Sequence, residues 1–179
     1  MSAVFFTADT HFGHKNIITS CKRPFASTDE MDEVLVKKWN DNVKEGDIVY
    51  HLGDFSLCKA SYARGIFHSL NGTIHLIMGN HDYGLPAWFH KLFATINNLK
   101  EIKIDGQRIV LCHYAMRTWN KAHYGSWQLH GHSHGSLLRQ EGLKSIDVGV
   151  DCHDYRPISF EEIKDIMAGI TWKPVDHHN

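Results

Sequence analysis

The amino-acid sequence predicts an α/β protein in which β-sheets are stacked and helices lie outside them. Two observations lead to this prediction. In the first half of the chain, short apolar runs rich in β-branched residues alternate with segments of helical period. In the second half, most segments have the character of strands. The 179 residues suffice for one domain with a substantial core, and we expect a single domain over residues 1–179.

Three strands and three helices are expected in the first half. Each predicted strand ends in polar residues, and the strands cover residues 3–9 (AVFFTAD), 47–54 (DIVYHLGD) and 73–79 (TIHLIMG). Apolar residues recur at helical spacing in the predicted helices, which cover residues 27–43, 62–70 and 86–94. Ser27 and Glu30 form a potential capping box at the start of the first helix. The chain between the first strand and this helix is rich in Gly, Pro and Ser and predicts a loop.

The second half begins with a predicted β-hairpin. Residues 100–114 (KEIKIDGQRIVLCHY) contain two apolar runs around Asp105-Gly106, a pair typical of two-residue hairpin turns. Two further strands and a closing helix are expected over residues 126–132, 145–151 and 159–169. The polar tail, residues 173–179, is expected to fray.

Composition argues against several classes of protein. The formal net charge of -1 provides no overall basic field that would attract nucleic acid. The apolar runs are too short to span a bilayer, and the N-terminal residues have no basic stretch typical of a signal peptide. The cysteines are scattered without a CxxC pair, which is typical of reduced thiols: Cys21, Cys58, Cys112 and Cys152. We therefore expect a cytoplasmic protein with no membrane partner, and the sequence leaves its oligomeric state open.

Residues with strong chemical character stand at, or just beyond, the ends of the predicted strands. They are Asp9, His11, Asp54, Asn80, His81, Asp82, His113, His132 and His134. In α/β folds, ligands bind in the crevice beyond the strand ends. The two-residue spacing in D-T-H and H-S-H would place both side chains on one side of an extended chain. Each motif alone also fits an ordinary turn, so the prediction of one shared site depends on their joint occurrence.

The predicted site combines imidazole, carboxylate and amide ligands without a thiolate. This set favours Mn, Fe, Zn, Co or Ni over Ca or Mg. The two oxygens of Asp54 could bridge two ions, while the neutral oxygen of Asn80 limits the negative charge at the site. Two divalent ions would carry more charge than Asp9 and Asp54 return. That surplus would hold a phosphate and lower the pKa of a bridging water.

In this order, the motifs D-x-H, G-D, G-N-H-D, H and G-H-x-H resemble those of the calcineurin-like metallophosphoesterase superfamily, over residues 9–134. The stretches DTHFGHKNI, YHLGDF and DVGVD are similar to a group of short bacterial and phage-type predicted phosphoesterases. The resemblance implies a four-layer sandwich, with two stacked β-sheets flanked by helices and a dinuclear metal site at one edge. We expect two divalent transition-metal ions, with Mn preferred over Fe, Zn, Co and Ni.

The resemblance also implies a role for each motif residue. It implies one ion held by Asp9, His11, Asp54 and His134, and a second ion held by Asp54, Asn80, His113 and His132. It implies that His81 is the catalytic histidine, which protonates the leaving oxygen or stabilises the charge that develops there. Asp82 would be the carboxylate that orients the imidazole of His81.

Several loop residues near the strand ends are candidates for binding a phosphate or stacking on a base, although a surface or packing role fits each equally well. They are His14, Arg23, Tyr83, Tyr114, Arg117, Trp119 and His123. The expected activity is hydrolysis of small phosphodiesters or nucleotide-type substrates through attack by metal-activated hydroxide. The sequence leaves open phosphomonoesters, nucleotide pyrophosphates or cyclic nucleotides as substrates. It also leaves open a nuclease, which should carry a basic groove or an added capping domain. A further alternative is a non-catalytic metal-binding interaction scaffold, which should have lost some ligands or the catalytic histidine.

Overall fold

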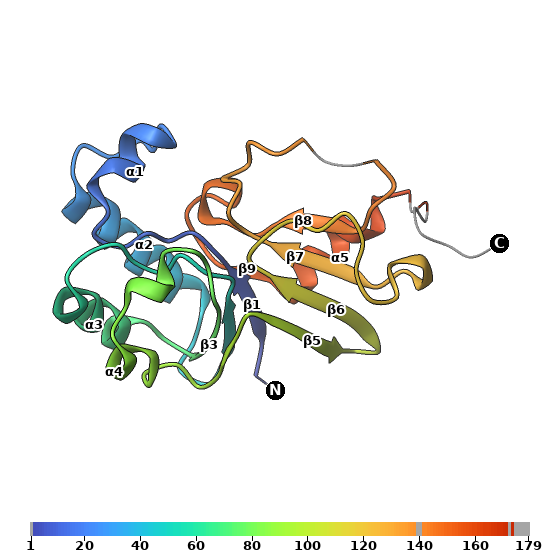
Figure 1. Cartoon of the computed structure of the whole chain (residues 1–179), viewed down its shortest axis with the longest axis horizontal. Helices are drawn as coiled ribbons and strands as arrows, with labels where there is room; N and C mark the ends of the chain where they lie inside the picture. Colours follow the sequence, from blue (N-terminus) through green and yellow to red (C-terminus); the bar gives the residue numbers. More distant parts are fainter. Residues whose placement is uncertain (1, 139–140, 172, 174–179) are drawn as a thin grey trace.

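Two β-sheets lie next to each other in the computed structural model, which describes residues 2–138, 141–171 and 173 (Figure 1). The first sheet has the strand order β4-β3-β2-β1-β9, with β1 (Val4–Thr7), β2 (Ile48–His51), β3 (Thr73–Ile77), β4 (Ile96–Asn97) and β9 (Ile158–Ser159). The second has the order β5-β6-β7-β8, with β5 (Leu99–Ile104), β6 (Gln107–Cys112), β7 (Trp127–His130) and β8 (Ser145–Asp147). The predicted α/β architecture of two stacked sheets flanked by helices is confirmed.

Most neighbouring strands run parallel. In the first sheet, β1 to β4 are parallel and only β9 is antiparallel to β1. In the second sheet, β6, β7 and β8 are parallel, whereas β5 and β6 form the predicted hairpin. Asp105 and Gly106 have φ angles of 48° and 85°, the left-handed pair that a type I′ turn requires. The parallel strands bring the residues that follow them to a common edge of each sheet.

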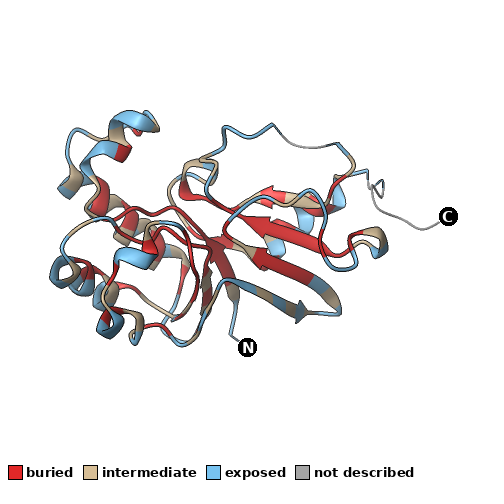
Figure 2. Ribbon diagram, in the orientation of Figure 1, coloured by how far each residue is buried: buried red, intermediate tan, exposed pale blue. Residues whose placement is uncertain are grey.

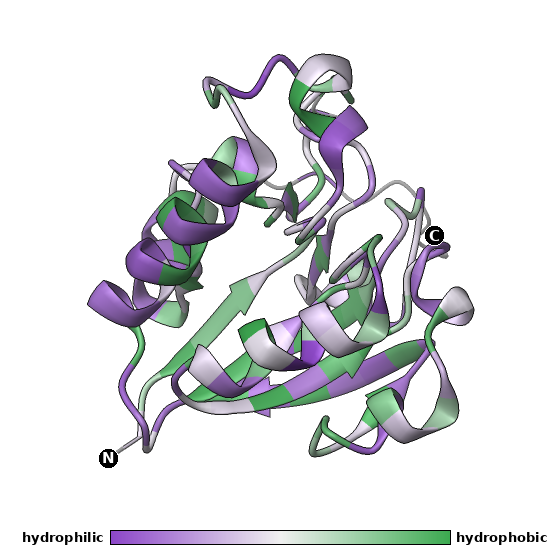
Figure 3. Ribbon diagram, turned by 90° about the vertical axis from the view of Figure 1, so that its left-hand side faces the viewer, coloured by the Kyte–Doolittle hydropathy of each residue, from purple (hydrophilic) through white to green (hydrophobic). Residues whose placement is uncertain are grey.

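Five helices flank the sheets within the described residues: α1 (Lys15–Ser20), α2 (Thr28–Asn42), α3 (Ala60–Ser69), α4 (Ala87–His90) and α5 (Phe160–Ala168). There are also three 3₁₀ turns in the described part: η1 (Asp82–Gly84), η2 (Ala122–Tyr124) and η3 (Val150–Cys152). Helices α1 to α4 lie on the side of the first sheet that faces away from the second (Figure 1). Figure 3 shows that these helices carry both hydrophilic and hydrophobic residues, as expected for a layer between core and solvent.

The alternation of side chains along β1 explains why two cores form. Phe5 points into the core shared with the helices, whereas Phe6 points into the core between the sheets. Helix α5 contributes Phe160, Ile163 and Met167 to the core between the sheets. Buried residues accordingly concentrate in the strands and in the loops where the two halves of the molecule meet (Figure 2). The site loops therefore rest on rigid, well-packed strands.

Local signals correctly predict the longer helices. Ser27 caps α2 by accepting a bond of 3.1 Å from the backbone N–H of Glu30, but the carboxylate of Glu30 accepts from Ala26 and not from Ser27. Only half of the predicted capping box therefore forms. Helix α5 has the complete box between Ser159 and Glu162.

The segment predicted as a loop before α2 contains the short helix α1. This helix has no side-chain cap and buries a single residue, Ile17. Tertiary packing, which the local sequence does not reveal, therefore supports it. The predicted frayed tail lies outside the described residues except for Lys173, whose backbone N–H donates to Gly142 O.

The described part of the chain contains no helix that is both long and apolar enough to cross a membrane. The four cysteines are free thiols, with no disulfide among them.

Candidate metal centre

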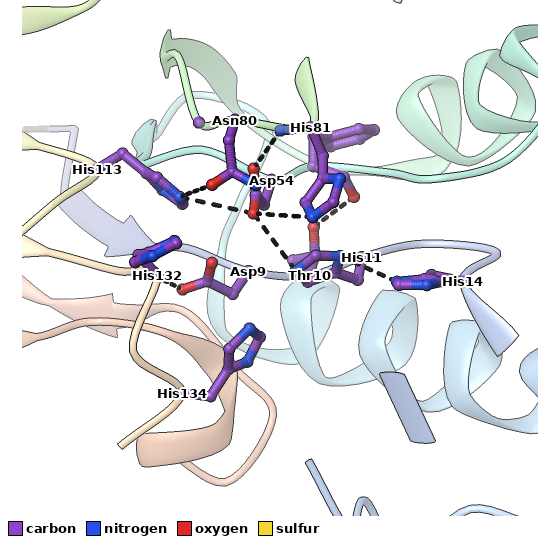
Figure 4. Close-up of polar contacts among 12 residues, drawn as sticks. Asp9, Thr10, His11, His14, Asp54, Asn80, His81, His113, His132 and His134 are labelled. Carbon is purple, nitrogen blue, oxygen red and sulfur yellow. Dashed lines mark hydrogen bonds and ion pairs between the residues drawn. The ribbon is translucent and has the colours of Figure 1, made fainter. Parts of the chain in front are cut away.

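Strand ends from both sheets meet at one place, which Figure 4 shows in close-up. The backbone N–H of Asp9 donates to Gly53 O at 2.9 Å, and that of His11 donates to Asp54 O at 3.0 Å. These bonds join the loop after β1 to the loop after β2. The N–H of His132, which follows β7, donates to Asp9 Oδ2 at 2.8 Å and so joins the second sheet to the first. The predicted convergence of the strand ends is present in the structure.

Many of the predicted ligands have a left-handed backbone conformation. Five of them have φ angles between 47° and 68°: Asp9, His11, Asp54, His132 and His134. Such angles are uncommon outside glycine, cost on the order of 1–3 kcal/mol each, and concentrate at functional sites. The extended geometry that we assumed for the D-x-H and H-x-H pairs is therefore wrong. Each pair instead uses two left-handed residues, and strain concentrated at this edge is the kind found at functional sites.

A first group of ligands consists of Asp9, His11 and His134, whose candidate ligand atoms all lie within 4.8 Å of one another. Asp9 is 0 % and His11 is 2 % exposed. Asp9 Oδ1 and His11 Nε2 are both buried without a hydrogen-bond partner among the described residues. A buried polar atom left unpaired costs about 1–3 kcal/mol. A cation bound between these two atoms would remove that cost, so the residues present fit a metal ion.

A second group consists of Asp54, His113 and His132, again with ligand atoms within 4.8 Å of one another. Asn80 adjoins this group, because its Oδ1 lies 3.3 Å from His113 Nε2. Asp54 Oδ2 lies 3.5 Å from His113 Nε2 and 3.6 Å from His11 Nε2 (Figure 4). The carboxylate of Asp54 thus stands between the two groups, where a bridging ligand would be needed.

The ring nitrogens that do not face the site are held by neighbouring groups. His113 Nδ1 donates to Leu52 O at 2.7 Å, which directs Nε2 toward Asp54. His11 Nδ1 is hydrogen-bonded to His14 Nδ1 at 3.3 Å, which likewise leaves Nε2 facing Asp54. Metal-binding histidines are commonly fixed in this way through their second nitrogen. His14, predicted to bind substrate, therefore contacts a candidate ligand.

The third oriented imidazole depends on a residue that the sequence analysis missed. His134 Nδ1 donates to Asp151 Oδ2 at 2.7 Å, and Arg23 donates to both oxygens of Asp151 at 2.8 Å. Arg23 also donates to the backbone carbonyls of Asp9 and Thr10, at 2.6 and 3.0 Å. Asp151 follows β8 as the other candidates follow their strands, so the same strand-end rule could have identified it.

Two predicted roles need correction. Arg23 is only 4 % exposed and its N–H groups are used within the interior, so it is a buried cross-link and not a phosphate-binding residue. Asp82 is fully buried, and its carboxylate accepts from the backbone N–H groups of Asp54, Phe55 and Gly79 at 2.8–3.0 Å. It therefore fixes the loops after β2 and β3. The expected bond from Asp82 to the imidazole of His81 is not among those of the described residues.

His81 lies over the site beside the two groups of ligands. Its backbone N–H donates to Asp54 Oδ1 at 2.9 Å, and its Nε2 lies 3.9 Å from Asp54 Oδ2. The side chain is 37 % exposed. Its ring lies 5.3 Å from that of His11 and 6.3 Å from that of His14. An imidazole in this position can reach a group bound at the site and exchange protons with solvent.

The remaining substrate candidates fall into two sets. Tyr114 lies at the rim, with its ring 4.8 Å from that of His132. Tyr83 is exposed, and its hydroxyl donates to Asn98. Trp119 is buried in a small core and its indole N–H donates to Ser126, so its predicted role in base stacking is wrong.

Arg117 and His123 lie in the same long loop as Trp119. Arg117 is exposed, and the ring of His123 packs on that of Tyr124 at 4.2 Å. The hydrogen bonds that hold the candidate ligands within the described part of the chain involve neither side chain. A role for them in substrate binding stays a prediction.

Burial shapes the charges of the site. Removal from water raises the pKa of the Asp9 carboxyl to about 7. Burial also opposes ionisation of Asp54, but hydrogen bonds from His113 and from the backbone N–H of His81 lower its pKa to about 2. Asp54 is therefore held as an anion by the protein itself. Asp9 accepts a bond from the backbone N–H of His132, but burial has the larger effect on its pKa, and a bound cation would stabilise its ionised form.

Comparison with known proteins agrees with this geometry. The model of the calcineurin-like phosphoesterase superfamily domain matches residues 3–154. The chain is 36% identical to MJ1445, an uncharacterized protein of Methanocaldococcus jannaschii, over 91% of this chain and 90% of that protein. It is 26% identical to the Gene 66 protein of Mycobacterium phage L5, over 95% of this chain and 96% of that protein.

A solved structure is also similar. It is that of AQ665, a protein of unknown function from Aquifex aeolicus, which superposes with a TM-score of 0.75 at 28% identity, over 93% of this chain and 100% of that one. The family match spans every candidate ligand, from the loop after β1 to His134 and on to Asp151. The chain belongs to the calcineurin-like phosphoesterase superfamily.

Proposed function

We propose that this protein is a dinuclear metal-dependent phosphoesterase that hydrolyses small phosphodiesters or nucleotide-type substrates. The observation that carries the proposal is the position of Asp54, whose Oδ2 lies 3.6 Å from His11 Nε2 and 3.5 Å from His113 Nε2. Each imidazole belongs to a separate group of potential ligands. One carboxylate shared by two such groups is suited to a pair of adjacent ions.

The ligands divide naturally between two ions. Asp9, His11, Asp54 and His134 would hold the first, and Asp54, Asn80, His113 and His132 the second. Mixed nitrogen and oxygen donors without thiolate suit Mn, and also accept Fe, Zn, Co or Ni. When bound, such ions activate water and neutralise phosphoryl oxygens.

His81 is the proposed proton donor to the leaving oxygen. Its ring stands above Asp54 and its side chain is 37 % exposed, so it can meet an ester oxygen bound at the centre. Diesters are the preferred substrates because an alkoxide leaving group gains most from protonation. Asp82 supports this step indirectly, because its bonds to the N–H groups of Gly79 and Asp54 fix the loops that carry His81 and the bridging carboxylate.

The surroundings favour a small substrate. With Arg23 buried in the interior, the predicted residues that stay near the ligands are the imidazole of His14 and the phenol of Tyr114. The formal net charge of -1 also provides no basic surface for a long polyanion. A nuclease therefore has less support than an enzyme acting on one phosphoester. The free thiols support our proposal that the protein works in the cytoplasm.

Reconstitution tests the proposal. Metal-free protein would be loaded with Mn²⁺, its metal content measured, and its activity followed on bis(p-nitrophenyl) phosphate, p-nitrophenyl phosphate and cyclic nucleotides. We expect two ions per chain and faster hydrolysis of the diester than of the monoester. Two bound ions without turnover of any ester would favour a binding scaffold. Activity confined to long DNA, with a steep dependence on salt, would favour a nuclease.

A further inference from the structure

A hollow of about 280 Å³ lies beside the loops of the metal centre. Its apolar walls come from Met116, Leu137, Leu143, Ile146 and Ile166, with Ala115 among the lining residues. Ligand pockets in proteins usually begin at about 300 Å³, so this space suits a group of one or two rings. We call it the β8 hollow, since Ser145, Ile146 and Asp147 of β8 also line it.

The connection between β7 and β8 explains why the hollow exists. These strands are parallel, and parallel strands are usually joined by a crossover that contains a helix covering the sheet. Here the described residues of the connection, 131–138 and 141–144, contain no helix (Figure 1). Leu137 and Leu138 in this connection are 50% and 88% exposed. Apolar side chains thus face solvent where a helix would normally pack.

The hollow is lined by residues that are close in sequence to the candidate ligands. Ala115 and Met116 follow the candidate ligand His113, Gly135 follows His134, and Cys152 follows Asp151. Gly149 separates the two spaces. A Cβ atom at that position would lie 2.9 Å from Asp147 Oδ1, on the side of the hollow, and 3.0 Å from Asp9 Oδ2, in the metal centre. The hollow and the metal centre thus lie on either side of one residue, close enough for a single substrate to reach both.

The lining selects for an uncharged ring. Lys and Arg are absent from the described lining, and its carboxylate, Asp147, accepts bonds from the backbone N–H groups of Gly135 and Gly149. His130 and His153 each use one ring nitrogen for a bond to a backbone carbonyl. Their other ring nitrogens have no hydrogen bond among the described residues. Apolar walls with two free imidazole edges fit a heteroaromatic ring and disfavour a second phosphate.

We propose that the β8 hollow binds the uncharged ring of the substrate, a nucleobase or a similar aromatic group, while its phosphate lies at the metal centre. The inference rests on the proposed function for the position of the phosphate. It also relocates base recognition from Trp119, which is buried in the small core that includes Leu143, to the hollow that Leu143 also lines.

Binding of adenosine, which has a base but no phosphate, tests the inference without metal or turnover. Metal-free protein with labelled Leu, Ile and Met methyl groups would be titrated with adenosine, and with ribose as the ring-free control. We expect saturable shifts at Met116, Leu137 and Ile146 with adenosine alone. Ala115→Phe, at an exposed lining residue, should weaken binding at least tenfold, whereas Ala94→Phe, at an exposed residue away from the hollow, should not.

A second variant and a kinetic comparison complete the test. Leu138→Ser changes an exposed side chain and should weaken adenosine binding without disturbing the fold. With Mn²⁺, the ratio of kcat/KM for a nucleoside diester to that for a methyl diester should fall about tenfold in Ala115→Phe. Adenosine binding without hydrolysis of any ester would contradict the proposed function but would support ring binding in the β8 hollow. Ester hydrolysis with no adenosine shifts, or with shifts unchanged in both variants, would overturn the inference.

Discussion

Replacing Asp151 by asparagine should weaken one metal site and spare the other. Asp151 accepts the Nδ1–H of His134 at 2.7 Å and two bonds from Arg23 at 2.8 Å. The asparagine would keep the size of the side chain, but its NH₂ group would meet one of these donors. His134 would then lose the charged acceptor that directs its Nε2 toward Asp9 and would have at most a neutral amide oxygen in its place. His113, oriented by Leu52 O on the far side of the centre, would be unaffected.

Asp151→Asn should lower both metal affinity and folding stability, and a second variant separates the two effects. Loss of a group that orients a metal-binding histidine lowers metal affinity by about 10–100-fold, or roughly 1.4–2.7 kcal/mol. The change also leaves the buried guanidinium of Arg23 without its counter-ion, which costs about 3–5 kcal/mol of folding stability. The double variant Asp151→Asn with Arg23→Gln removes that charge. We expect it to recover much of the stability while the metal affinity stays low.

The assay is a Mn²⁺ titration of the metal-free protein by calorimetry, together with urea unfolding of each variant. Two binding steps are expected for the wild type, of which only one should weaken in the single and double variants. Asp154→Asn is the matched control, because Asp154 is exposed and pairs with Lys38 at the surface. If both steps keep wild-type affinity in Asp151→Asn, or if affinity returns together with stability in the double variant, the orienting role is refuted.

Three further outcomes are expected. Asp54→Ala should remove both ions, and elemental analysis showing full occupancy would exclude a bridging role. His81→Ala should keep both ions while kcat falls by about 10²–10⁴, with a smaller loss for p-nitrophenolate esters; equal losses would exclude proton donation. Burial raises the pKa of the Asp32 carboxyl from 3.8 to about 6. Between these pH values the folded state keeps the proton and the unfolded state releases it. The free energy of unfolding should therefore fall by up to about 3 kcal/mol as the pH rises from 4 to 6. The free energy of unfolding of Asp32→Asn, measured with urea in EDTA, should therefore rise relative to that of the wild type between pH 4 and 6. A difference between the two proteins that does not change with pH would contradict the raised pKa of Asp32.

The sequence predicts the place of the site because its signals are local. The hydrophobic runs locate the strands, and the polar residues after them must gather at the edge where parallel strands end. Asp105-Gly106 specifies the hairpin for a similarly local reason, since few residue pairs accept two left-handed conformations. Neither inference requires knowledge of a distant contact.

The roles that were predicted wrongly depend on distant contacts. Arg23 follows a loop-like segment and suggests an exposed cation, but its partner Asp151 stands 128 positions further along the chain. Trp119 suggests an aromatic platform in a loop, but Val110 and Leu143 bury it. Asp82 lies next to His81 in sequence, yet its carboxylate turns toward the backbone of the loop after β2. Spacing along the chain does not determine which partner a side chain finds across the fold.

The unfavourable features of the metal centre have one common explanation. Five candidate ligands have left-handed backbone angles, and Asp9 Oδ1 and His11 Nε2 are buried without a partner in the described part of the chain. Burial also raises the pKa of Asp9 to about 7. Each feature costs folding free energy in the metal-free protein, and each would be offset by a cation at the same point. The strands and the cross-links through Arg23 and Asp82 hold the candidate ligands together, so a bound cation would add to the stability of the folded protein.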